Sequence, residues 1–317
     1  MIRTLKISEN KINEKKIIIL TGPTSSGKTT ISIELAKRYK TEIVSADSMH
    51  VYKKFDIGTG KPPKNIMSEI RHHLVDIIEP DKDFNAWKYM QIAREVIDLS
   101  NKDKLIISGG TQLYIKALVD GLISDLSKNE LDRNKLLEEL NSNGIEHMYN
   151  MLRDIDPVQA KKISSNDSQR IIRFLEINQL TGRLPSELFA EEEQIPLKDC
   201  EIIKVGLLIS KSKLDELINA RVDEMISEGL FDEVDALIES FGYNIKPLGS
   251  IGYKEICSYF KGDLTKDEAI EKIKTNTRRF AKRQLTWLKK DKEMIWFKNK
   301  EDLIKYCDCF TSNWLSF

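Results

Sequence analysis

The residue run with the clearest chemical meaning is Gly-x-x-x-x-Gly-Lys-Thr, which this chain carries at residues 22–29. Its glycines let the backbone curl so that several N–H groups point at one cluster of phosphate oxygens. The Lys28 ammonium can neutralise the terminal phosphates, and the Thr29 hydroxyl is placed to bind Mg²⁺. The run therefore predicts a di- or triphosphate site formed by Gly22, Pro23, Thr24, Ser25, Ser26, Gly27, Lys28 and Thr29.

The phosphate loop alone does not identify the compound that binds. ATP is the first expectation for such a loop, and a Gly-rich turn from a strand into a helix, with no ligand, is the alternative. The strand-like run 105–108 ends without the Asp of a Walker B strand.

A second candidate for chemistry is Asp47, which follows a short strand-like run at residues 42–45. In open α/β sheets, functional groups gather beyond the carboxyl ends of the strands, so we expect Asp47 to face the same crevice as Lys28. A carboxylate there can accept a proton from a nucleophile that attacks a phosphate-bearing donor; the alternative is a cap on the next segment. Residues 109–111 end another strand-like run at this edge and could supply backbone N–H groups and the Thr111 hydroxyl.

Basic residues gather toward the C-terminal end of the chain. From Lys274 to Lys290 there is no acidic residue, and Arg279 and Arg283 lie within a run of cations. Such a stripe matches a phosphate backbone, and an ordinary solvated helix face is the alternative. Helical spacing predicts a packed side opposite the cations, formed by Ile273, Phe280, Gln284 and Trp287.

A second basic cluster lies at residues 169–173, where amide and guanidinium groups alternate with apolar side chains. Arg170 and Arg173 are three residues apart and share a helix face. This arrangement is ordinary for a protein surface, but it also suits contact with RNA.

The elements that must position these groups alternate along the first part of the chain. Apolar runs predict buried parallel strands at residues 17–20, 42–45 and 105–107, and amphipathic spacing predicts helices at 30–40, 84–99 and 111–119. The stretch 58–63 contains Gly and Pro and must be a loop. This alternation is typical of a doubly wound α/β domain.

The pattern changes after residue 121. Helical pieces between polar turns predict a helical insertion, a strand-like run at 201–209 predicts a return to the sheet, and residues 211–240 and 264–290 have amphipathic helical spacing. We therefore predict an α/β fold with a P-loop NTPase-like parallel sheet flanked by helices. Residues 1–125 and 197–317 form its core with a helical C-terminal region, and residues 126–196 form the insertion.

Composition limits the class of protein. The 317 residues balance 50 Lys and Arg against 50 Asp and Glu, and 40% hydrophobic residues are enough for a folded core. No apolar run reaches the roughly 18 residues of a membrane helix, and no signal peptide is evident, so we expect a cytoplasmic protein without membrane contact. The four cysteines are too few for a disulfide scaffold, and Cys307-x-Cys309 lacks the further ligands of a zinc site.

Taken together, the motifs resemble those of the tRNA dimethylallyltransferases, also called tRNA isopentenylpyrophosphate transferases. The resemblance runs from about residue 17 to residue 290, and the order and spacing of the motifs make it specific. The matching segments are Gly-Pro-Thr-Ser-Ser-Gly-Lys-Thr (22–29), Asp-Ser-Met-His-Val-Tyr (47–52), Asp-Ile-Gly-Thr-Gly-Lys-Pro (56–62), His-His-Leu-Val-Asp (72–76), Gly-Gly-Thr-Gln-Leu-Tyr (109–114), Asn-Asp-Ser-Gln-Arg-Ile-Ile-Arg (166–173), Leu-Thr-Gly-Arg (180–183), Ile-Gly-Tyr-Lys-Glu (251–255) and Lys-Arg-Gln-Leu-Thr-Trp-Leu (282–288).

The resemblance implies transfer of a dimethylallyl group from dimethylallyl diphosphate to N6 of the adenine on the 3′ side of the anticodon. The substrates would be tRNAs that read codons beginning with U, and diphosphate would be released. Asp47 would be the general base that deprotonates N6 after the adenine has flipped into a channel. Thr24, Lys28 and Arg221 would hold the departing diphosphate, accompanied by Mg²⁺ at Thr29.

The resemblance also implies contacts with the anticodon stem-loop of tRNA. The helical insertion is similar to the family's mobile domain, which clamps the anticodon stem, and a monomer is expected. Together with the basic stripe near the C-terminus, the predicted tRNA contacts are Asp47, Ser48, Met49, His50, Thr111, Arg133, Gln169, Arg170, Ile171, Ile172, Arg173, Arg279 and Arg283.

Four positions depart from the pattern of the family that the chain resembles. An imidazole at His50 must replace the hydrogen bond that a side-chain amide makes to the tRNA, and it could titrate near neutrality. Phe174 is the bulkiest change and could tighten packing beside Arg173 or alter how the insertion hinges. The departures are His50 for Gln, Gly60 for Ala, Ser168 for Pro and Phe174 for Ala.

Three alternatives stay open on the sequence alone. A small-molecule P-loop kinase would use ATP, with Asp47 deprotonating a substrate hydroxyl, and would explain the first half of the core equally well. A prenyl transferase that acts on free AMP would have no use for the long C-terminal helical region. An RNA-binding ATPase without prenyl transfer would bind tRNA independently of any prenyl donor.

Overall fold

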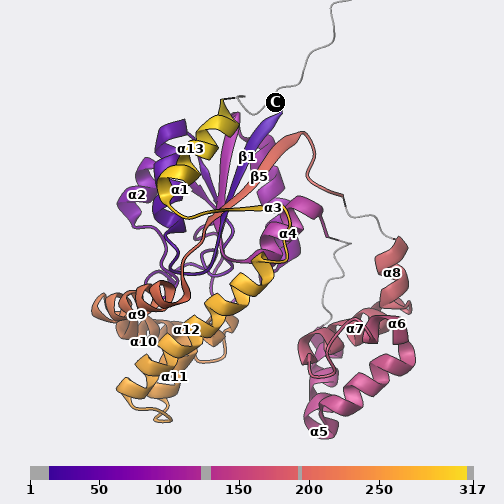
Figure 1. The fold of residues 1–317 in the computed structure, drawn as a ribbon. Coiled ribbons are helices and arrows are strands. Elements are labelled where there is room, and N and C mark those ends of the chain that lie inside the picture. Colours follow the sequence, from indigo (N-terminus) through magenta and orange to yellow (C-terminus); the bar gives the residue numbers. More distant parts are fainter. Residues whose placement is uncertain (1–13, 123–129, 192–194, 313–317) are drawn as a thin grey trace, which may run out of the picture. The chain divides into compact units, whose positions relative to one another are not determined.

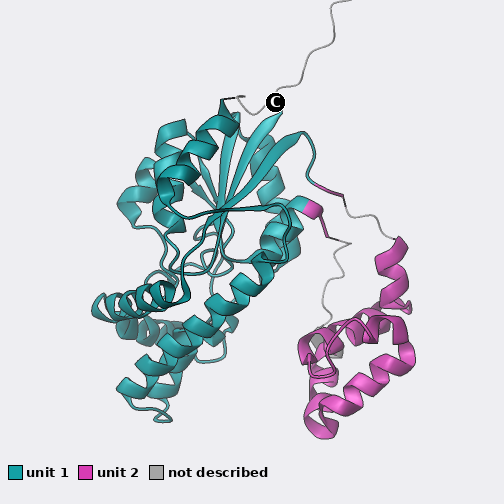
Figure 2. Cartoon of the chain, viewed as in Figure 1, with its two compact units in different colours: residues 1–119, 197–317 teal, residues 120–196 magenta. Residues whose placement is uncertain are grey.

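The computed structural model describes residues 14–122, 130–191 and 195–312, with the side chains of 130–132 outside the described part (Figure 1). It divides into two compact units (Figure 2). We refer to residues 1–119 with 197–317 as the core unit and to residues 120–196 as the insertion unit. The sequence-based division places the insertion at 126–196, with the same C-terminal boundary.

The core unit is built on a sheet whose described strands are all parallel, in the order β3-β2-β4-β1-β5-β6. The four predicted strands are present, which confirms the predicted fold class. The edge strands β3 and β6 were not predicted; β3 has only two residues, too few for a hydrophobic period to mark it. The strands are β1 (Lys15–Thr21), β2 (Ile43–Ser45), β3 (His72–His73), β4 (Lys104–Gly109), β5 (Cys200–Leu207) and β6 (Met294–Phe297).

Both faces of the central strand β1 are covered by helices. Alternate side chains of residues 17–20 enter two separate hydrophobic clusters, because successive side chains of a strand point to opposite faces. One cluster includes side chains of α3 (Ala86–Leu99) and α4 (Gln112–Asp120), and the other those of α1 (Lys28–Tyr39) and α13 (Lys300–Thr311). This double burial explains why the run is apolar throughout rather than alternating.

The helices between residues 211 and 288 gather on the side of the sheet where β1 and β5 end (Figure 1). This position brings them beside the phosphate loop, which follows β1. Within the described ranges, no helix combines the length and the apolar character needed to cross a bilayer. The remaining helices of the core unit are α2 (Lys64–Glu69), α9 (Lys211–Ser227), α10 (Leu230–Phe241), the 3₁₀ turn η1 (Lys246–Gly249), α11 (Tyr253–Phe260) and α12 (Lys266–Leu288).

The packed side of α12 differs from the predicted one. Phe280 and Trp287 are 37% and 42% exposed, so the prediction that they are packed was wrong. In each case the following residue is buried instead, because one residue rotates the side chain by about 100° around the helix. The buried side chains of α12 are Ala269, Ile273, Ala281, Gln284 and Leu288.

The insertion unit is helical throughout its described elements and has its own hydrophobic core. Gly144, with φ of 78° and ψ of 172°, interrupts its longest helix at the polar turn seen in the sequence. Phe174 is buried in this core, with its ring centroid 5.9 Å from that of Phe189. The helices are α5 (Glu130–Ile155), α6 (Pro157–Ala160), α7 (Ser168–Thr181) and α8 (Pro185–Glu191).

Candidate active site

The phosphate loop turns tightly between β1 and α1. Gly27 caps α1 with φ of 81°, a conformation that strains a residue with a side chain. The buried hydroxyls of Ser25 and Ser26 have no hydrogen-bond partner in the part of the chain that the structure describes. Ser25 and Ser26 line the cavity of the loop, and since buried hydroxyls are nearly always paired in proteins, they are groups that a bound oxyanion could pair with.

The buried ammonium group of Lys28 could pair with the negative charge of a bound phosphate group. Its Nζ atom donates a hydrogen bond of 2.6 Å to the carbonyl oxygen of Pro23, within the loop. Burial lowers the pKa of Lys28 to about 8; Asp47 acts in the opposite direction, and Arg221 lowers the pKa further. A bound diphosphate would supply the opposite charge that stabilises the protonated ammonium.

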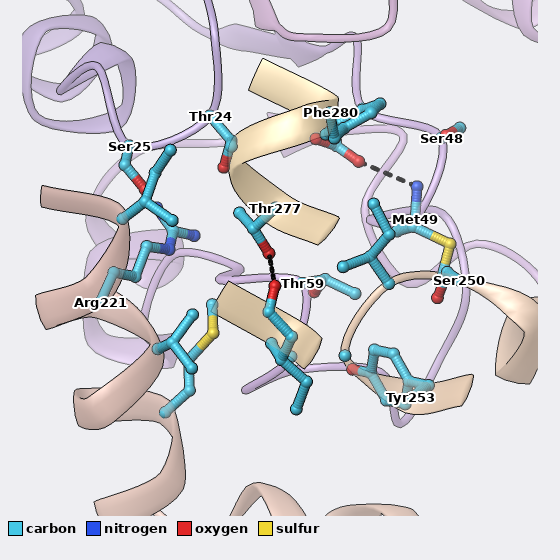
Figure 3. Close-up of a pocket in the computed structure, with 18 of the residues that line it drawn as sticks. Thr24, Ser25, Ser48, Met49, Thr59, Arg221, Ser250, Tyr253, Thr277 and Phe280 are labelled. Atoms are coloured by element: carbon cyan, nitrogen blue, oxygen red, sulfur yellow. Dashed lines mark hydrogen bonds between the residues drawn. The ribbon is translucent and has the colours of Figure 1, made fainter. Parts of the chain in front are cut away.

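Asp47 lines the same cavity as Lys28, at the carboxyl end of β2. Its Oδ1 atom accepts a hydrogen bond of 3.0 Å from the backbone N–H of Met49 (Figure 3). Asp47 therefore does cap the following turn, as the alternative interpretation proposed. The cap fixes the carboxylate through one oxygen and leaves Oδ2 outside this bond, so capping and proton acceptance are compatible.

Arg221 reaches the cavity from α9, on the side where Figure 3 shows Ser25 of the phosphate loop. Its guanidinium lies against the backbone of Gly60, where an added Cβ would come within 1.7 Å of Nη2. Gly60 also has φ of 63°, so both its conformation and its missing side chain permit this approach. Burial lowers the pKa of Arg221, whereas Asp47 raises it. Gly60 stands where the family that the chain resembles has Ala, and the missing Cβ leaves room for the guanidinium of Arg221 at this place.

His50 lies between Ser45, at the end of β2, and Thr59, in the loop that lines the cavity. Its Nδ1 is 3.1 Å from Ser45 Oγ, and its Nε2 is 3.3 Å from the carbonyl oxygen of Thr59. Burial lowers the pKa of His50 below its ordinary value, although Asp47 opposes the shift. This shift favours the neutral form of the imidazole; titration of His50 near neutrality stays a prediction.

A cavity of about 350 Å³ opens beside Asp47 and the phosphate loop (Figure 3). A second cavity of about 170 Å³ contains the phosphate loop and shares Thr24, Asp47 and Arg221 with the first. The arrangement can hold a molecule with a short apolar group at one end and phosphates at the other, with a carboxylate at the junction. We call the apolar part of the larger cavity the apolar chamber; it is lined by Ile218, Val222, Met225, Leu230, Tyr253 and Ile273.

Gln284 of α12 joins the phosphate loop to the end of β4. Its Oε1 accepts a hydrogen bond of 2.9 Å from the N–H of Thr24, and its Nε2 donates one of 2.9 Å to the Gly110 carbonyl oxygen. The sequence analysis placed Gln284 on a packed side but gave it no part in the site. A buried amide among apolar side chains was the available signal, since such a group needs partners.

Glu233 of α10 holds one wall of the site and was missed entirely by the sequence analysis. It accepts hydrogen bonds of 2.7–3.2 Å from three successive N–H groups of residues 56–58. It also accepts one of 2.6 Å from the Tyr253 hydroxyl. No local pattern could have revealed this role, because the donors are far from Glu233 in the sequence.

Thr111 braces the Asp47 turn from the end of β4. Its Oγ1 accepts a hydrogen bond of 2.9 Å from the N–H of Ser48, and its own N–H donates one of 3.0 Å to the Ala46 carbonyl oxygen. The expectation that the Thr111 N–H is available to a ligand is therefore corrected. Ser48, Met49 and the Thr111 side chain do line the larger cavity.

The cations of α12 divide into two groups. Lys274 binds Asp223 at 2.7 Å, and Arg278 binds Asn219 at 2.5 Å, so both are directed at α9. Arg279 and Arg283 are exposed, and the Arg283 guanidinium lies 5.7 Å from the centroid of the Phe280 ring. Arg283 and Phe280 also line the larger cavity. The N-terminal cations of the predicted basic stripe, Lys274 and Arg278, are therefore bound to α9. The middle of the stripe, at Arg283, lines the larger cavity of the site.

In the insertion unit, the predicted contact segment 169–173 forms the first turns of α7. The side chains of Ile171 and Ile172 are buried in the core of the unit, so the structure narrows the expected surface contact to Gln169, Arg170 and Arg173. Arg133 of α5 lies near this segment, since it and Arg173 bind the same carboxylate.

Comparisons with known proteins agree on one family. A family profile described as IPP transferase matches residues 50–291. The tRNA dimethylallyltransferase 2 of Geotalea uraniireducens is 41% identical over 304 residues, covering 95% of this chain and 96% of that protein. A structure of the tRNA isopentenylpyrophosphate transferase of Bacillus halodurans superposes with a TM-score of 0.68 at 34% identity, covering 94% and 97%. A eukaryotic dimethylallyltransferase acting on tRNA gives a TM-score of 0.77 at 30% identity, covering 94% and 80%.

Proposed function

This chain belongs to the IPP transferase family, and we propose that it transfers a dimethylallyl group from dimethylallyl diphosphate to tRNA. The acceptor would be N6 of the adenine on the 3′ side of the anticodon, in tRNAs that read codons beginning with U. The observation that carries this proposal is the apolar chamber, which opens onto the phosphate loop with Asp47 at the junction. A prenyl diphosphate has the same division into an apolar and a charged part.

The phosphate end of the donor would lie in the phosphate loop. The unpartnered hydroxyls of Ser25 and Ser26 and the buried Lys28 ammonium are groups that a diphosphate would satisfy. A small-molecule kinase would need polar groups around its acceptor, whereas one part of the larger cavity is the apolar chamber; polar side chains such as Ser250 and Thr277 line other parts of it. This contrast favours a prenyl donor over the kinase alternative.

In the proposed reaction, the N6 amine attacks C1 of the dimethylallyl group, and a C–N bond forms as the C–O bond to diphosphate breaks. The proton lost from N6 goes to the Asp47 carboxylate. Lys28 and Arg221 offset the negative charge that grows on the diphosphate oxygens, and Thr24 helps to hold them. Because these groups already line one pair of connected cavities, little reorganisation is needed.

Mg²⁺ fits the donor set at the phosphate loop. Thr29 lines the cavity beside Asp47 and offers a hydroxyl oxygen, which is a ligand type that Mg²⁺ prefers. Within the described ranges, no three His, Cys, Asp or Glu side chains form a metal site. Mg²⁺ commonly binds through few protein ligands together with substrate phosphates and water, so one hydroxyl is compatible with it. When bound, it would neutralise part of the diphosphate charge.

Contact with tRNA would involve both units. In the core unit, Ser48, Met49, His50 and Thr111 surround Asp47, and Arg279 and Arg283 present exposed cations on α12. In the insertion unit, Gln169, Arg170, Arg173 and Arg133 would contact the anticodon stem, for which this unit would act as a clamp. A monomer would suffice, because one chain supplies the lining of both cavities.

The test is to incubate the purified protein with Mg²⁺, dimethylallyl diphosphate and unmodified tRNA, digest the tRNA and analyse its nucleosides by mass spectrometry. We expect N6-dimethylallyladenosine at the position 3′ of the anticodon. Parallel reactions with AMP as acceptor, and with ATP in place of the prenyl donor, serve as controls. Prenylated AMP without a tRNA product would move the function to free nucleotides, and ATP consumption without prenyl transfer would favour a kinase or an ATPase.

A further inference from the structure

Glu176 is a buried carboxylate that links two arginines in the insertion unit. It lies on α7, its side chain is 0% exposed, and its Oε2 atom accepts hydrogen bonds from Arg173 at 2.8 Å and from Arg133 at 3.3 Å. Arg133 comes from α5 and Arg173 from α7. One carboxylate oxygen thus ties together two residues that the sequence analysis named separately as tRNA contacts.

This arrangement does not serve stability well. The other oxygen, Oε1, is buried without a hydrogen-bond partner among the described residues. A buried polar atom without a partner costs free energy, and buried ion pairs are often no more stabilising than apolar side chains of similar size. Around Glu176, α7 contributes Ile172, Leu175 and Ile177 to the apolar core of the unit. An apolar residue at this position would therefore give a simpler core.

A second buried carboxylate in the same unit, Asp156, has partners of a different kind from those of Glu176. Asp156 is also 0% exposed, but it accepts hydrogen bonds from the backbone N–H groups of Gln159 at 2.8 Å and Ser186 at 2.7 Å. Both of its oxygens are used, and both partners are backbone groups that begin a helix or a turn. Asp156 is therefore a structural carboxylate, whereas the partners of Glu176 are two long cationic side chains.

The two arginines reach from this buried carboxylate to the surface. The side chains of Arg133 and Arg173 are 28% and 32% exposed, so each is bound to Glu176 and is still partly accessible to solvent. A guanidinium carries several N–H donors in a fixed plane, so anchoring one of them sets the direction of the others. Arg170, three residues before Arg173 on α7, extends the same helix face.

We propose that Glu176 is a positioning residue for tRNA binding, which orients Arg133 and Arg173 toward the phosphate groups of the RNA. The proposal rests on the proposed function, because it assigns tRNA as the partner of this surface. Two guanidinium groups held in advance lose less side-chain entropy when RNA binds, and their planar donors match phosphate oxygens. The described ion pairs supply that order before the RNA arrives.

For the substitution Glu176→Gln, an orienting role of Glu176 and simple electrostatics predict opposite changes in tRNA affinity. Replacing a carboxylate near an RNA-binding surface by a neutral amide adds one positive charge, which by itself strengthens binding to a polyanion. The amide oxygen of Gln can still accept hydrogen bonds from the arginines, but it holds them less strongly than a carboxylate oxygen does. If Glu176 orients the arginines, Glu176→Gln therefore weakens binding in spite of this gain. We expect the Kd for tRNA to rise about fivefold and the salt dependence of binding to become shallower.

The experiment measures tRNA binding by the full-length protein at several salt concentrations, with thermal unfolding recorded for each variant. Asp156→Asn is the matched control for a buried carboxylate, and it should lower Tm without changing the Kd of the folded protein. Glu187→Gln, at an exposed position of α8, is the control for charge and should leave tRNA binding unchanged or slightly tighter. If Glu176→Gln does not fold, Glu176→Asp shortens the anchor while keeping its charge and is expected to weaken binding in the same direction.

A double-mutant cycle with Arg173→Lys completes the test. Lysine keeps the charge but lacks the planar donors, so we expect its effect on Kd to be smaller in the Glu176→Gln background than in the wild-type protein. Unchanged or tighter tRNA binding by a folded Glu176→Gln protein would overturn the inference. Failure of the wild-type protein to bind tRNA at all would instead overturn the proposed function, so the two failures can be told apart.

Discussion

The phosphate loop and the apolar chamber meet at Asp47, but they are built in opposite ways. The phosphate loop is one contiguous run, residues 22–29, whose chemistry is carried by glycines, a lysine and hydroxyl groups in fixed order. The apolar chamber is lined by side chains from α9, α10, α11 and α12, and each of them is an ordinary core residue in its own helix. A polar site can thus be formed by residues that are contiguous in the sequence. An apolar cavity, by contrast, exists only where several helices leave the space between them unfilled.

The largest expected effect lies at the junction of the two regions. Asp47→Asn retains an oxygen that can accept the Met49 N–H, so the turn should stay capped while the proton acceptor is lost. We expect kcat to fall by about 100- to 10,000-fold, with tRNA binding nearly unchanged, because a general base acts in the transition state. Single-turnover rates and tRNA Kd values would be measured side by side. Equal losses in both would show that Asp47 is chiefly a structural cap.

The phosphate side of the comparison is tested by pH. Burial lowers the pKa of Lys28 to about 8, so its ammonium is protonated below this pH and loses its proton above it. We expect kcat/KM for dimethylallyl diphosphate to be level just below pH 8 and to fall about tenfold per pH unit above it. Lys28→Met should have a kcat/KM at least about 100-fold lower and should lack this descending limb. A limb that persists in Lys28→Met would assign the titration to another group.

The apolar side is tested by filling the chamber. Val222 is buried and lines the chamber. We expect Val222→Phe to raise KM for dimethylallyl diphosphate about tenfold, because the larger ring occupies the place of the prenyl group. Inhibition by inorganic diphosphate should be unchanged, since this ligand uses only the phosphate loop. A parallel loss of diphosphate inhibition would mean that the two regions are not separable.

The smallest expected effect concerns the exposed cations at the mouth of the site. Arg279→Ala combined with Arg283→Ala should weaken tRNA binding about five- to tenfold and reduce the slope of log K against log salt by about 1 to 2. The matched control is Lys274→Ala combined with Arg278→Ala, whose cations bind Asp223 and Asn219 instead. Similar slopes for the two double variants would show that α12 contributes only its general charge.

Much of the fold could be predicted because its strands are buried on both faces. Residues 17–20 and 105–107 are continuous apolar runs bounded by polar residues, and such runs predict strands of a parallel sheet. The edge strands β3 and β6 were not predicted, and they are mostly half-buried, unlike the short inner strand β2, whose three residues are all buried. On α12, the side of burial was predicted only in part, since Phe280 is apolar yet exposed at the cavity.

The sequence by itself predicted the phosphate loop, and it determined the class of fold and, through the order of its motifs, the family of this protein. These features depend on residues that are close together along the chain or on the period of apolar side chains. Tertiary structure alone decided that Glu233 holds residues 56–58, that Gln284 bridges the loop and β4, and that Glu176 joins two arginines. The physical reason is that a hydrogen bond depends on distance in space. The sequence near a buried carboxylate or amide does not show which distant residue the packing will bring close enough to be its partner.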